Sequence, residues 1–189
     1  MASRIVTSQP SFQATISISP SSVALNEAAI LRVTATLPHS SPVTIFTWGT
    51  IYDTNLAYTQ GFKCTDLTSD TAIAVCRAKN KRAPFSSELE GGDDVYFQTL
   101  EPGETTVSKG SFDLAEREHH GEHVLMRGHR YRLEPKDGHL VTSWWHGSKE
   151  ETMSPAGQRA PLKEPDGPPI LLECDVWAEF QVVEETTPA

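Results

Sequence analysis

The chain has 189 residues, a formal net charge of −9 and a pI of about 5.2. This acidity disfavours nucleic acid and anionic membranes as partners, and no stretch approaches the roughly 20 apolar residues of a membrane helix. The first ten residues lack the apolar segment of a secretory signal. We therefore expect a cytoplasmic protein, long enough to bury a core without a metal or a disulfide.

Short strands follow one another along the first half of the chain. Apolar and polar residues alternate at 14–18 and 31–37, which predicts strands with one buried face. The segment 43–48 is apolar on both faces, as in a strand that is packed on both sides. Two further strands are expected around 61–66 and 72–78.

The stretch 95–114 has the pattern of two strands joined by a tight turn. Pro102 supplies the fixed φ of the second position of a type II turn, and Gly103 accepts the positive φ of the third. Alternation continues on both sides of this turn. We therefore predict a hairpin at the centre of the fold.

A second hairpin is predicted further along the chain. The segments 129–133 and 139–145 are strand-like, and the Asp137-Gly138 pair between them is typical of a hairpin turn. Before them, the polar segment 115–123 reads as a helical turn or a long loop.

The last quarter of the chain begins with a long loop. Residues 147–169 contain five prolines and several glycines, so we expect them to be disordered or to form a lid. Strands at 170–172 and 176–183 close the fold, and 184–189 is expected to be a flexible tail.

Together these elements predict a fold class. Many short strands without a sustained helical period are typical of an all-β protein, here an antiparallel, immunoglobulin-like β-sandwich with long loops. We expect one such domain to span residues 1–183.

The cysteines do not form a disulfide scaffold, because their number is three. Cys64 and Cys76 pair only if their strands are neighbours, which leaves Cys174 over. In a reducing compartment we expect all three to be thiols.

A histidine-rich segment is the first candidate for chemistry. His119, His120 and His123 are weak candidates for metal ligands, and Glu122 and His123 are candidates for general acid–base catalysis. Gly121 disfavours the helix that would bring the imidazoles together. A solvated polar loop is therefore the favoured interpretation, and no metal or cofactor is expected.

The segment Trp144-Trp145-His146 is the second candidate. Neighbouring residues of a strand face opposite sides, so we expect one indole in the core and the other on the outer face or on the side of the long loop. The outer indole and His146 beside the long loop would suit a small apolar ligand, with His146 as a catalytic acid or base in an enzyme.

Three residues that follow the apolar segment 43–48 are assigned to the same hypothetical pocket. Tyr52, Asp53 and Tyr58 are predicted to share it as ligand-binding residues. The sequence contains neither a G-x-S-x-G nucleophile elbow nor a Gly-rich phosphate loop.

Several short motifs, taken in order, resemble a known family: Trp48-Gly49-Thr50, Lys81-Arg82-Ala83-Pro84, Leu100-Glu101-Pro102-Gly103-Glu104, Asp113-Leu114 and Gly128-His129-Arg130-Tyr131. Over residues 14–133 the chain is similar to the N-terminal β-sandwich domain of the fungal deuterolysin and peptidyl-Lys metalloendopeptidase group. The H-E-x-x-H motif of that group's protease module is absent. The resemblance implies a free-standing, non-proteolytic sandwich of fungal origin.

Two functions remain open from the sequence. The first is a non-catalytic module that binds a small apolar molecule or a protein, which predicts a filled core and an exposed apolar patch. The second is a cofactor-independent isomerase or cyclase of secondary metabolism, which predicts an enclosed pocket of about 300–1,000 Å³. Open sandwich edges would also allow a homodimer.

Overall fold

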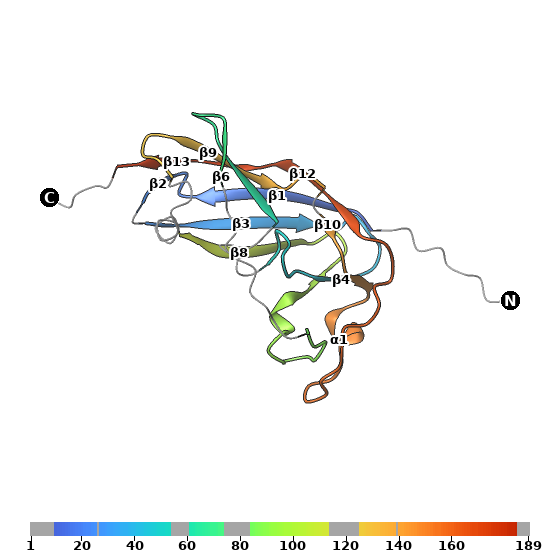
Figure 1. The fold of residues 1–189 in the computed structure, drawn as a ribbon. Helices are drawn as coiled ribbons and strands as arrows, with labels where there is room; N and C mark the ends of the chain where they lie inside the picture. Colours follow the sequence, from blue (N-terminus) through green and yellow to red (C-terminus); the bar gives the residue numbers. More distant parts are fainter. Residues whose placement is uncertain are drawn as a thin grey trace.

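The computed structural model describes residues 10–25, 27–53, 61–73, 84–113, 125–138 and 140–184. Their regular secondary structure is almost entirely β-strand (Figure 1), and the one α-helix among them is α1 (Lys149–Thr152). The predicted all-β, sandwich-like fold is confirmed. Among the described residues, no helix has the length and hydrophobicity to cross a membrane.

The first large sheet has five strands in the order β10-β12-β1-β3-β8. Their bounds are β1 (Phe12–Ser19), β3 (Ala28–Thr36), β8 (Thr105–Asp113), β10 (Leu140–Val141) and β12 (Ile170–Val176). Burial alternates strictly along β1, because every second side chain points into the core. The predicted strands at 14–18 and 31–37 are thus present as β1 and β3.

The second large sheet has the order β2-β13-β9-β5-β6. Its strands are β2 (Ser22–Ala24), β5 (Phe62–Asp66), β6 (Thr71–Ile73), β9 (Arg130–Pro135) and β13 (Ala178–Val183). Most neighbours are antiparallel, but β1 with β12 and β2 with β13 are parallel pairs. These two pairs are a departure from the wholly antiparallel arrangement expected from the sequence.

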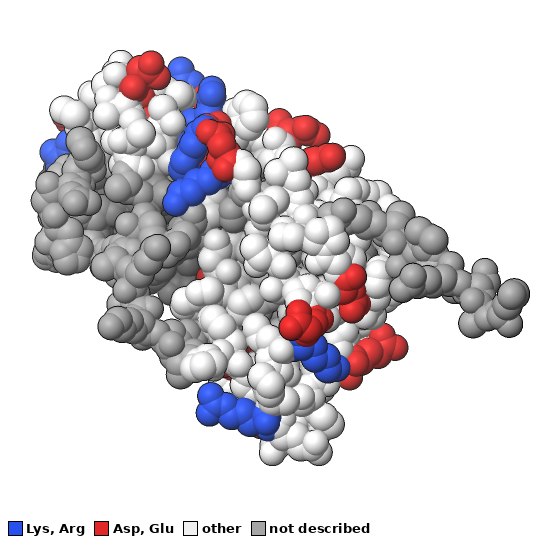
Figure 2. Space-filling view, turned by 45° about the vertical axis from the view of Figure 1, so that its right-hand side comes forward, with Lys and Arg blue, Asp and Glu red and all other residues white. Residues whose placement is uncertain are grey.

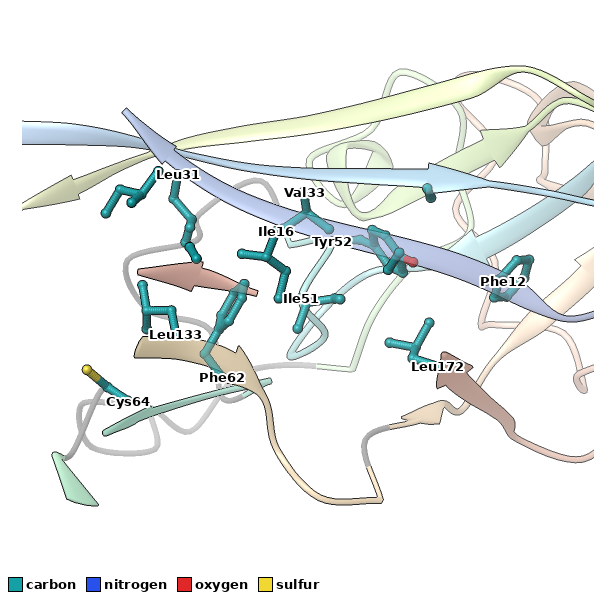
Figure 3. Packing of buried hydrophobic residues seen from close by; sticks show 14 of the residues in the cluster. Phe12, Ile16, Leu31, Val33, Ile51, Tyr52, Phe62, Cys64, Leu133 and Leu172 are labelled. Atoms are coloured by element: carbon teal, nitrogen blue, oxygen red, sulfur yellow. The ribbon is translucent and has the colours of Figure 1, made fainter. Parts of the chain in front are cut away.

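The main core lies between these two sheets (Figure 3). Phe12, Ile16 and Leu31 from the first sheet meet Phe62 and Leu133 from the second. Burying one such side chain stabilises a fold by about 1.5–3 kcal/mol. The core therefore depends on the alternation that the sequence displays.

A smaller third sheet lies at one side of the sandwich, together with α1 (Figure 1). It contains β4 (Val43–Phe46) between β11 (Trp144–His146) and β7 (Phe97–Leu100). All four residues of β4 are buried, as predicted for a strand packed on both sides. Its second side is covered by a separate hydrophobic cluster around Phe46, Phe97, Trp145 and Met153.

The predicted central hairpin is wrong, although its turn is correct. Gly103 has φ +71°, and the amide of Glu104 donates to the carbonyl of Glu101 over 3.2 Å. However, β7 pairs with β4 in the third sheet, whereas β8 pairs with β3 in the first. The turn reverses the chain, but its two strands join different sheets.

The second predicted hairpin is wrong for the same reason. Gly138 has φ +67°, but β9 belongs to the second sheet, β10 to the first and β11 to the third. A turn sequence specifies a local change of direction, and distant partners decide where each strand pairs.

Some of the sequence-based predictions concern residues outside the described ranges. The expected strand at 72–78 overlaps β6 at residues 72 and 73, and its remaining residues lie outside the described ones. The tail from 185 onward, Cys76 and the segment 115–123 also lie outside them. The short strand β2 was not predicted, because Pro20 and two serines precede it.

Candidate functional site

The two adjacent tryptophans of β11 are both buried. Trp144 is 2% exposed in the main core, and Trp145 is 5% exposed in the second cluster. They face opposite sides of the strand, and both sides are covered. Of the two expected positions for the second indole, the exposed outer face is wrong, and the side facing the loop is the one that Trp145 occupies.

Both indoles hold the loop that follows their strand. Trp144 Nε1 donates to the carbonyl oxygen of Pro168 and Trp145 Nε1 to that of Glu164, each over 2.9 Å. Asp166 accepts from the backbone amide of His146 over 2.7 Å through its Oδ2. This end of the 147–169 loop is consequently ordered against β11.

The other end of this loop is ordered as well. Ser148 and Glu151 form a capping box at the start of α1. Isolated bridges join Ser154 to Glu88 and Pro161 to Ser86. Of the two alternatives expected for residues 147–169, disorder is wrong, because side-chain and backbone hydrogen bonds hold the segment along its length; the lid stays a prediction.

His146 lies partly exposed at the end of β11. Its imidazole contacts the edge of Trp144 with ring centroids 5.1 Å apart, and a second imidazole, that of His39, lies 5.9 Å away. The structure therefore brings His146 and Trp144 together, but with the indole inside the core.

Tyr52 and Asp53 are buried rather than arranged around an open pocket. Tyr52 is 1% exposed, and burial, followed by the charge of Cys174, raises the pKa of its hydroxyl well above the usual range. Asp53 Oδ2 accepts from the amide of Gly49 over 3.2 Å. Tyr52 shares the main core with Trp144.

The remaining predicted site residues are Tyr58, His119, His120, Glu122 and His123, all of which lie outside the described residues. Within the described ranges, no group of three or more His, Cys, Asp or Glu side chains is arranged to hold a metal ion. Cys174 is a free thiol.

An aromatic cluster on the third sheet was missed by the sequence analysis. Trp48 is 43% exposed, and its ring lies 4.8 Å from Tyr96 and 5.3 Å from Phe85, measured between centroids. Phe85 in turn makes an edge contact at 4.7 Å with the buried ring of Phe46. We call Trp48, Phe85 and Tyr96 the aromatic face.

A groove continues from the aromatic face. It has a volume of about 290 Å³ and is lined by Pro84, Phe85, Arg159, Ala160 and Pro161. Phe85 belongs both to this groove and to the aromatic face, so the two form one surface. Little in the sequence indicates this surface, because the two walls of the groove are far apart in the chain.

A second groove of about 290 Å³ lies where the chain passes from β12 to β13. Trp177, also 43% exposed, and Cys174 line it together with Lys63 and Glu134. Lys63 forms ion pairs with Glu134 at 2.9 Å and Asp137 at 3.2 Å, which raise the pKa of its ammonium group. This groove is therefore more polar than the first.

A buried carboxylate orients a histidine at the start of β9. The Nδ1–H of His129 donates to Asp66 Oδ2 over 2.7 Å, and Asp66 Oδ1 accepts from the amides of Thr68 and Ser69. Burial alone raises the pKa of Asp66, but these hydrogen bonds outweigh it and hold the pKa below the ordinary value.

No protein-family model and no curated protein matches this chain. Among solved structures, the chain is similar to the alkylpurine DNA glycosylase AlkC of Pseudomonas fluorescens bound to DNA with an abasic site analog. The TM-score is 0.37 and the identity 11%, over 71% of this chain and 30% of that one.

A second similar structure is the β-glucosidase EmGH1 of Erythrobacter marinus, with a TM-score of 0.33 and 14% identity over 67% of this chain and 14% of that one. The chain thus spans less than a third of the length of either protein. Likenesses this distant carry no argument about function.

Proposed function

We propose that the chain is a non-proteolytic β-sandwich module that binds a protein or a small apolar ligand through its aromatic face. The observation that carries this proposal is the position of Trp48. Its ring contacts Phe85 and Tyr96, which are partly buried against the second cluster, and itself stays 43% exposed. Exposed Trp and Tyr side chains offer large contact area at a low entropic cost.

The charge distribution supports a partner of this kind. On the face in Figure 2, the described charged side chains form small groups of mixed sign with uncharged surface between them. An extended basic stripe is what nucleic-acid binding requires. Together with the net charge of −9, this favours a protein or an apolar molecule as the ligand.

The similarity to the N-terminal domain of the deuterolysin group supports a binding role without catalysis. It also carries the proposals of a fungal origin and of a module without a protease. A cytoplasmic location is proposed from the sequence alone, and the free thiol of Cys174 agrees with it.

The isomerase or cyclase alternative stays a prediction. Its proposed acid–base residue His146 lines neither of the two grooves of about 290 Å³. Glu122 and His123 lie outside the described residues. The module is therefore the function that the described geometry supports better.

The test is a selection of random peptides displayed on phage against the full chain, followed by binding to two variants. Trp48 and Trp177 are equally exposed at 43%, so Trp177→Ala is a matched control for Trp48→Ala. We expect the selected peptides to bind Trp48→Ala about tenfold or more weakly and Trp177→Ala as they bind the wild type. Equal binding to both variants would overturn the proposal.

A further inference from the structure

The groove beside the aromatic face indicates which class of ligand this surface binds. Resting on the function proposed above, we infer that the groove binds an extended, proline-rich segment of a partner protein that carries an acidic side chain. Four features of this surface support the inference: the backbone of the groove walls, their rigidity, the aromatic surface and the charge of Arg159.

The groove walls offer few hydrogen-bonding groups to a ligand backbone. Pro84 and Pro161 have no N–H. The carbonyl of Ala160 already accepts from the amide of Ser87 over 2.8 Å, and the carbonyl of Pro161 accepts from Ser87 Oγ over 3.1 Å. Because Pro84 and Pro161 supply no donors, an extended ligand cannot complete a regular β-ladder along these walls.

This property selects against an ordinary β-strand ligand. Each buried N–H without an acceptor costs free energy comparable to a lost hydrogen bond. A proline residue has no N–H to leave unpaired, and the polyproline II helix has no internal hydrogen bonds to break. Proline-rich segments accordingly fit a groove with this wall.

The groove is held in shape without a ligand. The amide of Leu89 donates to the carbonyl of Ser154 over 2.9 Å, and the amide of Gly157 donates to Glu88 Oε1 over 2.8 Å. The bridge between Ser86 and Pro161 closes the same pair of segments. A preformed groove and a preformed polyproline helix both reduce the entropy lost on binding.

The aromatic face extends the surface that such a segment can contact. Phe85 lines the groove and lies 5.3 Å from Trp48 and 5.8 Å from Tyr96, measured between ring centroids. Proline-rich segments dock on aromatic-lined grooves because the pyrrolidine rings pack on flat aromatic surfaces. The groove and the face together accommodate successive turns of one extended segment.

Arg159 supplies the preference for an acidic residue. It lines the groove, is exposed and forms no ion pair within the described part of the chain. In a chain with a net charge of −9, this guanidinium is a local positive site. A carboxylate on the ligand gains a charge-assisted hydrogen bond there, whereas an ammonium group is repelled.

Fluorescence anisotropy with labelled peptides of about ten residues tests the inference on the full chain. Three peptides are compared: a proline-rich peptide with one Asp, the same peptide with Lys for Asp, and a version with Ala for every proline. We expect the first to bind most tightly, with a preference for Asp over Lys of about threefold or more.

Variants separate the possible outcomes. Arg159→Glu should reverse the preference between the Asp and Lys peptides, and Trp48→Ala should weaken both about tenfold. Equal binding of the proline-free peptide, or an unchanged preference in Arg159→Glu, would overturn the inference and leave the proposed function standing. If no peptide binds and the phage selection yields no Trp48-dependent peptide, both are overturned.

Discussion

At the scale of single residues, the best-defined polar interaction is the pair of Asp66 and His129. The carboxylate is almost completely buried and accepts three hydrogen bonds, from His129 Nδ1 and from the amides of Thr68 and Ser69. Strand alternation placed Asp66 at the end of a strand, but nothing in the sequence paired it with His129. The two residues are 63 positions apart.

Asp66→Asn should lower the free energy of unfolding by about 1–3 kcal/mol at neutral pH, because His129 loses a carboxylate acceptor in a buried setting. Urea denaturation measures this change. Asp137→Asn is the control, since the Asp137 side chain is 94% exposed and its exposed ion pair contributes about 0–1 kcal/mol. An equal decrease in the free energy of unfolding of the two variants would contradict a stabilising role of the Asp66–His129 hydrogen bond.

The same pair predicts a pH dependence. The folded pKa of Asp66 lies below its unfolded value, which is about 3.9. Its ionised form therefore stabilises the fold above the unfolded pKa, and this stabilisation is lost as the pH falls through the folded pKa. The difference in the free energy of unfolding between the wild type and Asp66→Asn should thus have its largest value at neutral pH and decrease below about pH 4. A difference that stays constant into strong acid would contradict this origin.

At the scale of elements, the contact between β11 and the loop that follows it decides the shape of the third sheet. The loop sequence, rich in proline and glycine, predicts irregular backbone correctly but says nothing of its anchoring. Two indole N–H groups and the Asp166 carboxylate supply that anchoring. Buried indoles need acceptors, and the loop carbonyls are the acceptors that lie within reach.

Gly167→Ala tests this anchoring. A Cβ at position 167 would lie 2.6 Å from Trp144 Cζ2, whereas one at Gly92 would have no neighbour within 4 Å. We expect Gly167→Ala to destabilise the protein by about 1–3 kcal/mol through overpacking, and Gly92→Ala to change stability by less than about 0.5 kcal/mol. Thermal unfolding of both variants checks this, and equal melting temperatures would contradict the packing argument.

At the scale of the whole molecule, the edges of the sheets matter for association. β8 is the last strand of the first sheet, and no described strand pairs with its outer edge. Lys109 lies in the middle of β8 and is exposed. A lysine in the middle of an edge strand opposes edge-to-edge pairing of two molecules.

Lys109→Thr should therefore increase self-association, because the edge loses its charge and gains a residue that favours strands. Sedimentation velocity over a range of concentrations measures the change. Lys136→Thr removes the same charge from a turn and serves as the control. If both variants remain as monodisperse as the wild type, Lys109 does not prevent pairing of molecules through the β8 edge.

The sequence by itself determined the all-β class, the main strands and the positions of the turns, because these depend on residues close together in the chain. Alternation at β1 and the Pro102-Gly103 turn are examples. Tertiary structure alone decided which sheet each strand joined and whether a face was covered. Trp145 is buried because a second cluster packs on it, and the groove exists because Phe85 and Arg159, 74 positions apart in the sequence, meet at one surface. Periodicity encodes which face of a strand is apolar, but contacts between distant segments determine what lies against that face.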